Sequence, residues 1–431
     1  MRIRIILCFA LLLLSFRSVF AETYKSGHFI IHSDLDRRYV QLIQANAEAY
    51  YENMAGQYFQ TAGGKPLTIY YSKTQSETFQ LLRKHERKNK ANRSYYVSDE
   101  AAIYTYRFTN EGGIIEIGTL FHEITHHFVR SNFKDPPAWF NEGLACFLGD
   151  ETRIVKGKIK VGEPNPRREE EIKERIEKGI KPNLKRLFPM TQKQLYNWPI
   201  GYNFSRAFFY WLHENRKLEE YLQNVQKNGY ELWVLEQTVH KSVNEINEEL
   251  LAFIQKDCYA GAYLRQGRRS RNEAQKREAF LKALQLKPNY RKAKLELALC
   301  FYRSGDYKQC RSWLRDILQF PESSEYRDAT EYMGHSYYEQ GNYTEALEYY
   351  QKSLEYSDYY EYKYNLYYGI ACCHHYMKDY ATAKKFYKMF LDGNWEPEKY
   401  PKKVEYAKEY QKRGVKEESE EKLNMKQNGK D

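Results

Sequence analysis

The feature that most constrains the fold of this 431-residue chain is an internal repeat in its last third. Small residues recur at Ala298, Gly334 and Ala371, at spacings of 36 and 37 positions. Three further series keep the same spacing: Tyr307, Tyr343 and Tyr380; Cys310, Ala346 and Ala383; Leu314, Tyr350 and Tyr387. A repeat of this length is typical of architectures in which each unit buries its apolar face against the next. The pattern predicts an all-α solenoid.

These repeats resemble the tetratricopeptide repeat, a helix-turn-helix unit of about 34 residues. The two or so extra residues per unit fit loops near Pro321 and Asp358. The resemblance covers residues 258–392, including an imperfect first unit that ends at Pro288. It implies a concave surface for a protein partner or a substrate segment. Residues 393–431 read as a charged tail, and we expect Pro401 to Asp431, rich in Lys and Glu, to be disordered or a frayed helix.

The first 21 residues have the pattern of a secretory signal peptide. Arg2 and Arg4 precede an apolar run that is too short to span a bilayer, and Ala21 ends a small-residue cleavage pattern before Glu22. We therefore expect cleavage after Ala21, a secreted or periplasmic protein, and no stable membrane span once the peptide is removed. An uncleaved anchor is the alternative, which Arg17 disfavours because it interrupts the apolar stretch.

Charge and cysteine usage exclude some classes of function. The formal net charge is +11, but Lys and Arg are interspersed with Glu and form no basic strip with aromatic residues, so no nucleic-acid partner is expected. Seven cysteines, including Cys8 in the signal peptide, are too few for a disulfide scaffold. Cys300 and Cys310 could form a bridge only if their α-carbons lie within about 7 Å.

Residues 22–118 alternate between strand and helix patterns and predict an α/β layer. Expected strands are His28–His32, Leu67–Tyr71, Ala101–Phe108 and Ile114–Ile117, and expected helices are Arg38–Phe59 and Thr74–Asn89. The pattern of residues 119–257 predicts a series of helices. The first runs from Leu120 to Arg130 with Thr119 as its N-cap, and the second has Asp135 as its N-cap and Gly149 after its end.

The first of these helices carries the sequence His122-Glu123-Ile124-Thr125-His126. A helix places residues i and i+4 one above the other, so both imidazoles can reach one metal ion. Zinc accepts two histidine nitrogens readily, and a catalytic zinc keeps one position open for water. Glu123 lies about 100° around the helix from His122, where it can take a proton from that water instead of binding the metal.

A third metal ligand is expected on the next helix. It carries Trp139-Phe140-Asn141-Glu142-Gly143-Leu144-Ala145, and a glutamate there would complete a two-histidine, one-glutamate zinc site. The two motifs together resemble the gluzincin metallopeptidases of the peptidase-MA-like superfamily, a group that contains thermolysin. The resemblance runs from about Phe29 to Glu214. It implies a zincin-like α+β fold, His122, His126 and Glu142 as Zn²⁺ ligands, and Glu123 as general base.

The resemblance also makes predictions about the substrate. It implies that a strand before the active helix, within Ala101–Phe108, holds an extended peptide by strand addition. No exopeptidase Gly-Ala-Met-Glu-Asn motif lies upstream, which favours an endopeptidase over an aminopeptidase. Similar proteins carry a tyrosine near the position of Tyr202, which we nominate as the donor to the oxyanion of the reaction. A purely structural role for Tyr202 is the alternative, since the chain has 41 tyrosines.

The sequence therefore predicts an exported zinc metallopeptidase that hydrolyses peptide bonds, with repeats that bind a protein partner or the substrate. Two alternatives remain open at this point. The zincin-like domain can be catalytically inactive, in a scaffold whose function lies in the repeats. The hydrolysed bond can also lie outside proteins, because metal-activated water attacks other acyl groups.

Overall fold

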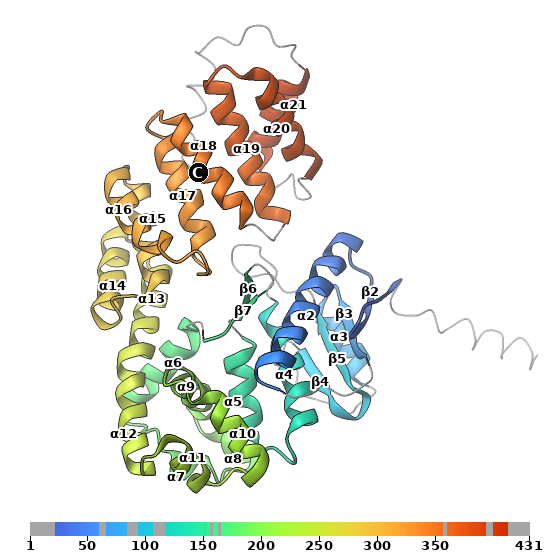
Figure 1. The fold of residues 1–431 in the computed structure, drawn as a ribbon, viewed down its shortest axis with the longest axis vertical. Coiled ribbons are helices and arrows are strands. Elements are labelled where there is room, and N and C mark those ends of the chain that lie inside the picture. Colours follow the sequence, from blue (N-terminus) through green and yellow to red (C-terminus); the bar gives the residue numbers. More distant parts are fainter. Residues whose placement is uncertain are drawn as a thin grey trace, which may run out of the picture. The chain divides into compact units, whose positions relative to one another are not determined.

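The computed structural model divides into two compact units, Met1–Arg265 and Gln266–Asp431 (Figure 1). The structure describes residues 22–59, 66–83, 94–106, 117–150, 152–155, 158–162, 165–356, 360–393 and 400–412. The predicted signal peptide and, apart from Ile117, the strand predicted over 114–117 lie outside the described residues. Among the helices described, none has the length and apolar character needed to cross a membrane.

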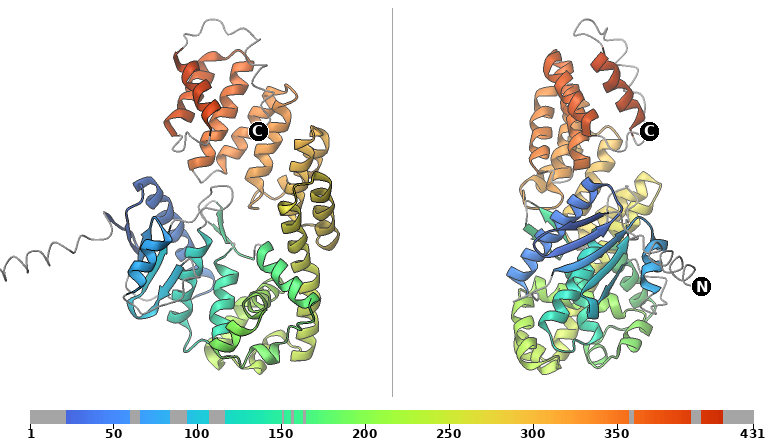
Figure 2. Two further views of the ribbon diagram at one scale, coloured as in Figure 1. Left: turned by 180° about the vertical axis from the view of Figure 1, so that it is seen from behind. Right: turned by 90° about the vertical axis from the view of Figure 1, so that its right-hand side faces the viewer.

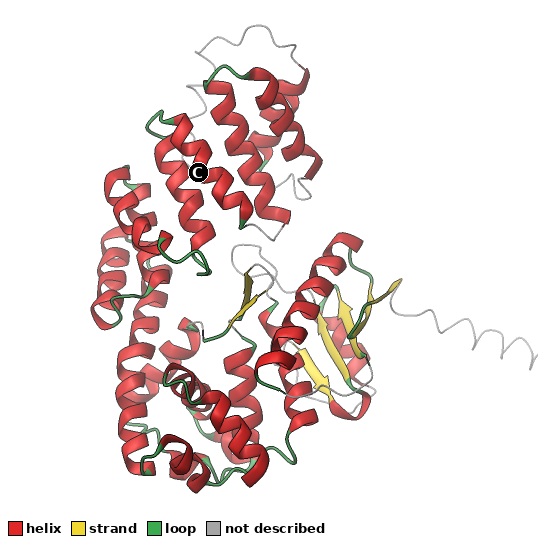
Figure 3. Ribbon diagram, viewed as in Figure 1, coloured by secondary structure: helices red, strands yellow, loops and turns green. Residues whose placement is uncertain are grey.

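A five-stranded mixed sheet forms the N-terminal layer of the first unit (Figure 3). Its spatial order is β1-β2-β3-β5-β4; β2, β3 and β5 are mutually parallel, and β1 and β4 pair antiparallel at the two edges. The bounds are β1 Glu22–Lys25, β2 Phe29–Ser33, β3 Leu67–Ser72, β4 Ser94–Val97 and β5 Ala102–Tyr106. Strand β4, the edge strand beside β5, has no counterpart among the strands predicted from the sequence.

Helices cover both faces of this sheet, and the interior strand β5 accordingly buries four consecutive residues, whose side chains point alternately to the two faces. Helix α2 (Arg37–Gln57) lies on one face, where Tyr51 meets Phe29 of β2 edge to face at 5.7 Å. Helix α3 (Gln75–Leu82) lies on the other face (Figure 2), where Leu82 packs with Tyr95 and Tyr104. The predicted β-α-β-α order of residues 29–82 is confirmed, with end points shifted by a few residues.

Among the described residues from 117 to 265, the secondary structure is helical apart from one hairpin, β6 (Arg153–Val155) with β7 (Lys158–Lys160). The helices are α4 Gly118–Asn132, α5 Ala138–Leu148, α6 Pro166–Glu177, α7 Leu184–Leu187, α8 Gln192–Asn197, α9 Gly201–Glu214, α10 Leu218–Asn228, α11 Leu232–Val239 and α12 Val243–Phe253. Helix α12 continues through a π-helical turn, η3 (Ile254–Cys258), into α13 (Tyr259–Arg269).

Two predicted helix caps are wrong. Helix α4 begins at Gly118, so Thr119 lies inside its first turn, and the N-cap is Ile117, without a side-chain hydrogen bond. Helix α5 begins at Ala138 after the N-cap Pro137. Asp135 adopts a left-handed backbone (φ 44°) two residues earlier, in the turn that leads into the helix.

The second unit is a solenoid of helix pairs, as predicted. Within each pair, a residue with a small side chain lets two helices approach closely: a Cβ atom on Gly334 would lie 2.7 Å from the Tyr350 ring. The helices are α14 Glu273–Leu286, α15 Arg291–Arg303, α16 Tyr307–Leu318, α17 Tyr326–Tyr338, α18 Tyr343–Glu355, α19 Tyr360–Tyr376 and α20 Tyr380–Gly393.

The expectation that the tail beyond Pro401 is disordered or frayed is wrong for its first part. Residues Pro401–Lys412 form helix α21, and Val404, Tyr406 and Ala407 are buried in a cluster with Tyr387 and Phe390 of α20. Ala407 follows Ala371 by 36 positions, so α21 continues the repeat register. The sequence did not reveal this helix because its few buried residues are interspersed with Lys and Glu. Residues 413–431 lie outside the described part of the chain.

Candidate metal centre

The candidate site lies where α4 crosses α5, and two glycines allow the close approach. A Cβ atom on Gly149, at the end of α5, would overlap the backbone of His122, and one on Gly118 would overlap the carbonyl of Asp150. A third glycine, Gly143, lets α5 approach α9: its Cβ would lie 2.7 Å from the Cβ of Ser205. The small residues near the two motifs therefore fix where the motif side chains meet.

The opposite face of α4 anchors it to the sheet layer. Phe121, Ile124 and Phe128 are fully buried. Phe121 stacks on Tyr50 of α2 with ring centroids 4.2 Å apart, and Thr125 hydrogen bonds the Tyr50 hydroxyl at 2.7 Å. This anchoring holds His122 and His126 toward α5.

The structure brings His122, His126 and Glu142 together. The two Nε2 atoms are 3.1 Å apart, and each is 3.8 Å from Oε2 of Glu142. Their side chains are only 11–15% exposed. The predicted ligand set thus converges from two neighbouring helices.

This donor set fits a zinc ion. Ligand atoms about 2.1 Å from a tetrahedral zinc lie about 3.4 Å from one another, a value bracketed by the observed separations. Each imidazole also has a partner on its other nitrogen: Nδ1 of His122 lies 3.0 Å from Asp150 Oδ1, and Nδ1 of His126 lies 3.0 Å from Asn141 Oδ1. Such partners leave the Nε2 lone pairs free for a metal.

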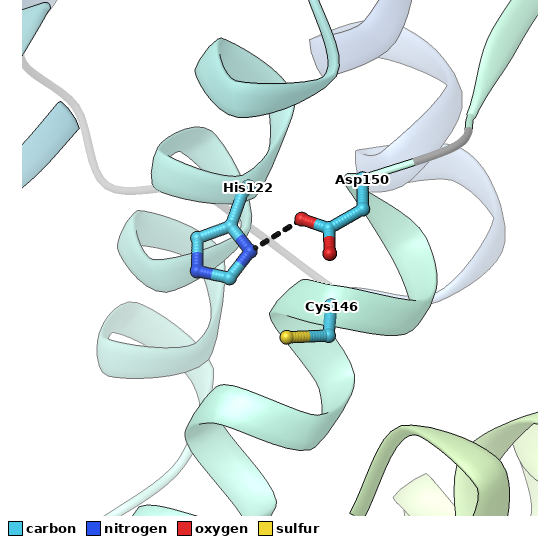
Figure 4. A group of neighbouring side chains, drawn as sticks. All are labelled: His122, Cys146 and Asp150. Carbon is cyan, nitrogen blue, oxygen red and sulfur yellow. Dashed lines mark hydrogen bonds and ion pairs between the residues drawn. The ribbon is translucent and has the colours of Figure 1, made fainter. Parts of the chain in front are cut away.

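Asp150 is itself held by further side chains, to which no sequence pattern pointed. Its Oδ2 accepts a hydrogen bond from Nε of Arg168 at 2.7 Å, and Arg168 contacts Asn203 Oδ1 at 3.4 Å. Figure 4 shows Asp150 pointing at the His122 ring, with the Cys146 sulfur beside them. Glu142, Cys146 and Asp150 follow one another at intervals of four residues, so one stripe of α5 and its C-terminal end faces His122.

These neighbours shift the pKa values of the site. Burial lowers the pKa of His126 to about 4. Burial alone would also lower the pKa of His122, but the hydrogen bond and charge of Asp150 raise it well above its ordinary value. Burial would raise the pKa of Asp150, whereas Arg168 and His122 hold it well below its usual range. The carboxylate of Asp150 therefore separates the two imidazoles, favouring the protonated form of His122 while burial favours the neutral form of His126.

Glu123 is buried beside the ligand set. Burial raises the pKa of its carboxyl to about 7; His122 opposes this shift and Glu142 adds to it. The carboxylate accepts a hydrogen bond from the backbone N–H of Tyr96 in β4. A carboxyl group with a pKa near neutrality can both take and return a proton.

The prediction that a strand within Ala101–Phe108 holds an extended peptide by strand addition is wrong, because that strand has no free edge. Within this range the strand is β5, which pairs with β3 on one side and with β4 on the other. The edge beside α4 is β4, which also supplies the Tyr96 hydroxyl that lies 3.0 Å from Nδ1 of His127. His127 is turned toward this strand, away from the three converging side chains.

Tyr202 lies near the site, together with a second tyrosine that was not predicted. Burial raises the pKa of Tyr202, and Glu142 and a hydrogen bond with Tyr196 act in the same direction. The two phenol rings stack with centroids 5.4 Å apart. The Tyr196 hydroxyl lies 3.5 Å from Oε1 of Glu142. Tyr196 itself is 47% exposed. Its position on α8 gave no sequence signal among so many tyrosines.

The other cysteines of the described residues carry free thiols. Cys300 and Cys310 are both buried; Cys300 hydrogen bonds Glu273, whereas Cys310 packs with Leu295 and Leu314. In the sequence Cys372-Cys373-His374-His375, Cys372 contacts the Tyr387 hydroxyl and His374 contacts Asp379. These partners diverge, as expected for successive helical residues.

Comparisons with known proteins identify the repeats. Residues 326–393 match the tetratricopeptide repeat family, and residues 274–353 match the family of anaphase-promoting complex, cyclosome, subunit 3. The C-terminal part of the chain therefore consists of tetratricopeptide repeats, which typically bind protein partners. Neither match extends to the residues that form the candidate metal centre.

No curated protein matches this chain. One solved structure, described as "Functional Characterization of Pseudomonas Aeruginosa pilF", is similar at 15% identity and a TM-score of 0.31, and the match covers 46% of this chain and 87% of the other.

Proposed function

We propose that this protein is an exported zinc-dependent peptidase of the gluzincin type whose repeats bind its substrate or a protein partner. The observation that supports the zinc site best is the convergence of His122, His126 and Glu142 with separations of 3.1–3.8 Å. The comparisons support the repeat half of this proposal and not the peptidase half. Sequencing of the N-terminus, with Glu22 expected first, tests the proposed export.

The chain's own residues have defined roles in this proposal. His122, His126 and Glu142 would hold the ion, and Asp150 and Asn141 orient the two imidazoles. A zinc ion there would supply Lewis-acid catalysis, polarising a carbonyl and acidifying water. Glu123, buried beside the three converging side chains, would take the proton from water and pass it to the leaving amine. Tyr202, or its neighbour Tyr196, would donate to the oxyanion.

Cleavage of a mixed peptide library tests this proposal. Glu123→Gln should abolish cleavage and retain the bound zinc, because the amide cannot act as a base and Glu123 is not a ligand. Ser131→Ala, at an exposed position of the same helix, is the control and should keep both cleavage and zinc. Equal cleavage by wild type and Glu123→Gln would exclude the proposed mechanism, and the absence of peptide cleavage by the zinc-loaded wild type would exclude a peptidase.

The second candidate function is a repeat-mediated interaction scaffold with a catalytically inactive metal domain. The family matches over residues 274–393 favour it. Partner capture followed by complementation of a deletion strain separates the two candidates. A scaffold retains its full biological effect with Glu123→Gln, whereas a peptidase loses that effect while its repeats still bind the partner.

A further inference from the structure

An open pocket of about 520 Å³ lies on the surface of α7, α8 and the segment between them. Trp198, only 4% exposed, forms part of its wall. The guanidinium group of Arg186 lies over the indole ring, 4.8 Å from the centroid. This cation–π contact keeps the Arg186 guanidinium beside the wall of the pocket. Lys193 supplies a second cation, and Gln194 and Asn197 add side-chain amides.

The residues that line the pocket carry positive charge and no negative charge. No Asp or Glu occurs between Glu177 and Glu214, although this segment contains several Lys and Arg residues. Within the described part of the chain, neither Arg186 nor Lys193 has an acidic partner at ion-pair distance. Every residue that lines the pocket is either cationic or neutral. An anionic group is therefore the complementary occupant.

One short helix connects this pocket to the candidate metal centre. Helix α8 carries Lys193 and Asn197, which line the pocket. It also carries Tyr196, whose hydroxyl lies 3.5 Å from Oε1 of the proposed metal ligand Glu142. Six helical residues span only about 9 Å. An extended peptide advances about 3.3 Å per residue, so a side chain a few residues from a bond held at the metal centre can reach the pocket.

We propose that this pocket binds a carboxylate side chain of the peptide substrate, so that the enzyme prefers peptides with Asp or Glu a few residues from the scissile bond. This inference rests on the proposed function for the identity of the substrate. Arg186 and Lys193 contribute charge, and the amides of Gln194 and Asn197 contribute hydrogen-bond donors. The selectivity weakens as salt is added, because the cations are exposed.

Binding rather than turnover tests the proposal. The probes are two fluorescent peptides that differ only in one residue, Glu or Gln, read by anisotropy with the full-length, zinc-loaded Glu123→Gln protein. We expect the Glu peptide to bind about fivefold more tightly, as for one or two exposed charge pairs. Adding Arg186→Gln and Lys193→Gln should remove this preference, whereas adding Lys185→Gln, an exposed neighbour outside the pocket, should keep it.

The outcomes also separate the pocket from the peptidase proposal. Equal affinity for the two peptides, or a preference that survives loss of both cations, overturns the pocket assignment even if the wild type cleaves peptides. A preference that depends on Arg186 and Lys193 supports the pocket even if no peptide is cleaved. Circular dichroism of each variant confirms that it is folded, and Arg186→Lys, which keeps the charge, should retain part of the preference.

Discussion

At the scale of single residues, the convergence of His122, His126 and Glu142 could be predicted, and the side chains that support them could not. His122, Glu123 and His126 follow helical periodicity, and Glu142 lies in a distinctive neighbouring motif. Asp150 contacts His122 across 28 positions of sequence, and Arg168 contacts Asp150 across 18. Such pairs depend on how α4, α5 and α6 pack, which a single sequence does not encode in any local pattern. Tyr196 escaped prediction for the same reason.

Asp150 gives the sharpest prediction at this scale. Asp150→Asn should weaken zinc binding about 10- to 100-fold, because His122 loses its charged partner and Arg168 is left with an unpaired buried charge. Competition with a chelator of known affinity measures the change. Asp135→Asn, an acid in the turn before α5, is the control and should bind zinc like the wild type. Unchanged affinity in Asp150→Asn would remove the orienting role of this residue.

At the scale of elements, the glycines at helix crossings are predicted to contribute to stability, because they let two backbones approach closely. Gly149→Ala should lower the stability of the first unit by about 1–3 kcal/mol, because the new Cβ would overlap the His122 backbone. Gly56→Ala, on α2, places its Cβ in open space with nothing within 4 Å, and should be neutral or stabilising by about 0.5–1 kcal/mol. Urea unfolding of both variants measures the difference. Equal stabilities would show that α4 and α5 do not cross closely.

Helix α21 provides the second prediction at this scale. A chain that ends at residue 399 exposes the faces of Tyr387 and Phe390 that Val404 and Tyr406 cover. The repeat unit should lose at least about 2 kcal/mol of unfolding free energy. A chain that ends at Lys412 keeps α21 and serves as the matched control. If the shorter chain unfolds at the same urea concentration as this control, α21 does not complete the solenoid.

The elements also show where sequence patterns are sufficient. The spacing of Ala298, Gly334 and Ala371 predicted the solenoid, because equivalent positions recur in each repeat and each recurrence confirms the same alignment of the units. The edge strand β4 was missed because Ser94–Val97 shows no alternation: three of its four residues, Ser94, Tyr95 and Val97, are buried. The caps at Thr119 and Asp135 were misplaced because nearby prolines and glycines set the helix starts.

At the scale of the whole molecule, the two units should respond differently to metal. Zinc binding only to the folded first unit raises its apparent stability by mass action, by about 2.7 kcal/mol when free zinc is 100 times the dissociation constant. Differential scanning calorimetry should therefore show one transition that rises with zinc and falls with a chelator. The transition of the repeat unit should not move, because the proposed ligands all lie in Met1–Arg265. Two transitions that shift together, or not at all, would contradict this assignment.

The central claim is that three side chains from α4 and α5 bind one zinc ion, and zinc content per chain tests it most directly. After purification and dialysis against trace zinc, elemental analysis should find one zinc per wild-type chain. Glu142→Gln should retain little, because the site loses its only carboxylate ligand, while Glu123→Gln should retain one. A wild-type chain without zinc, or a Glu142→Gln chain that binds it as tightly as the wild type, would contradict the claim.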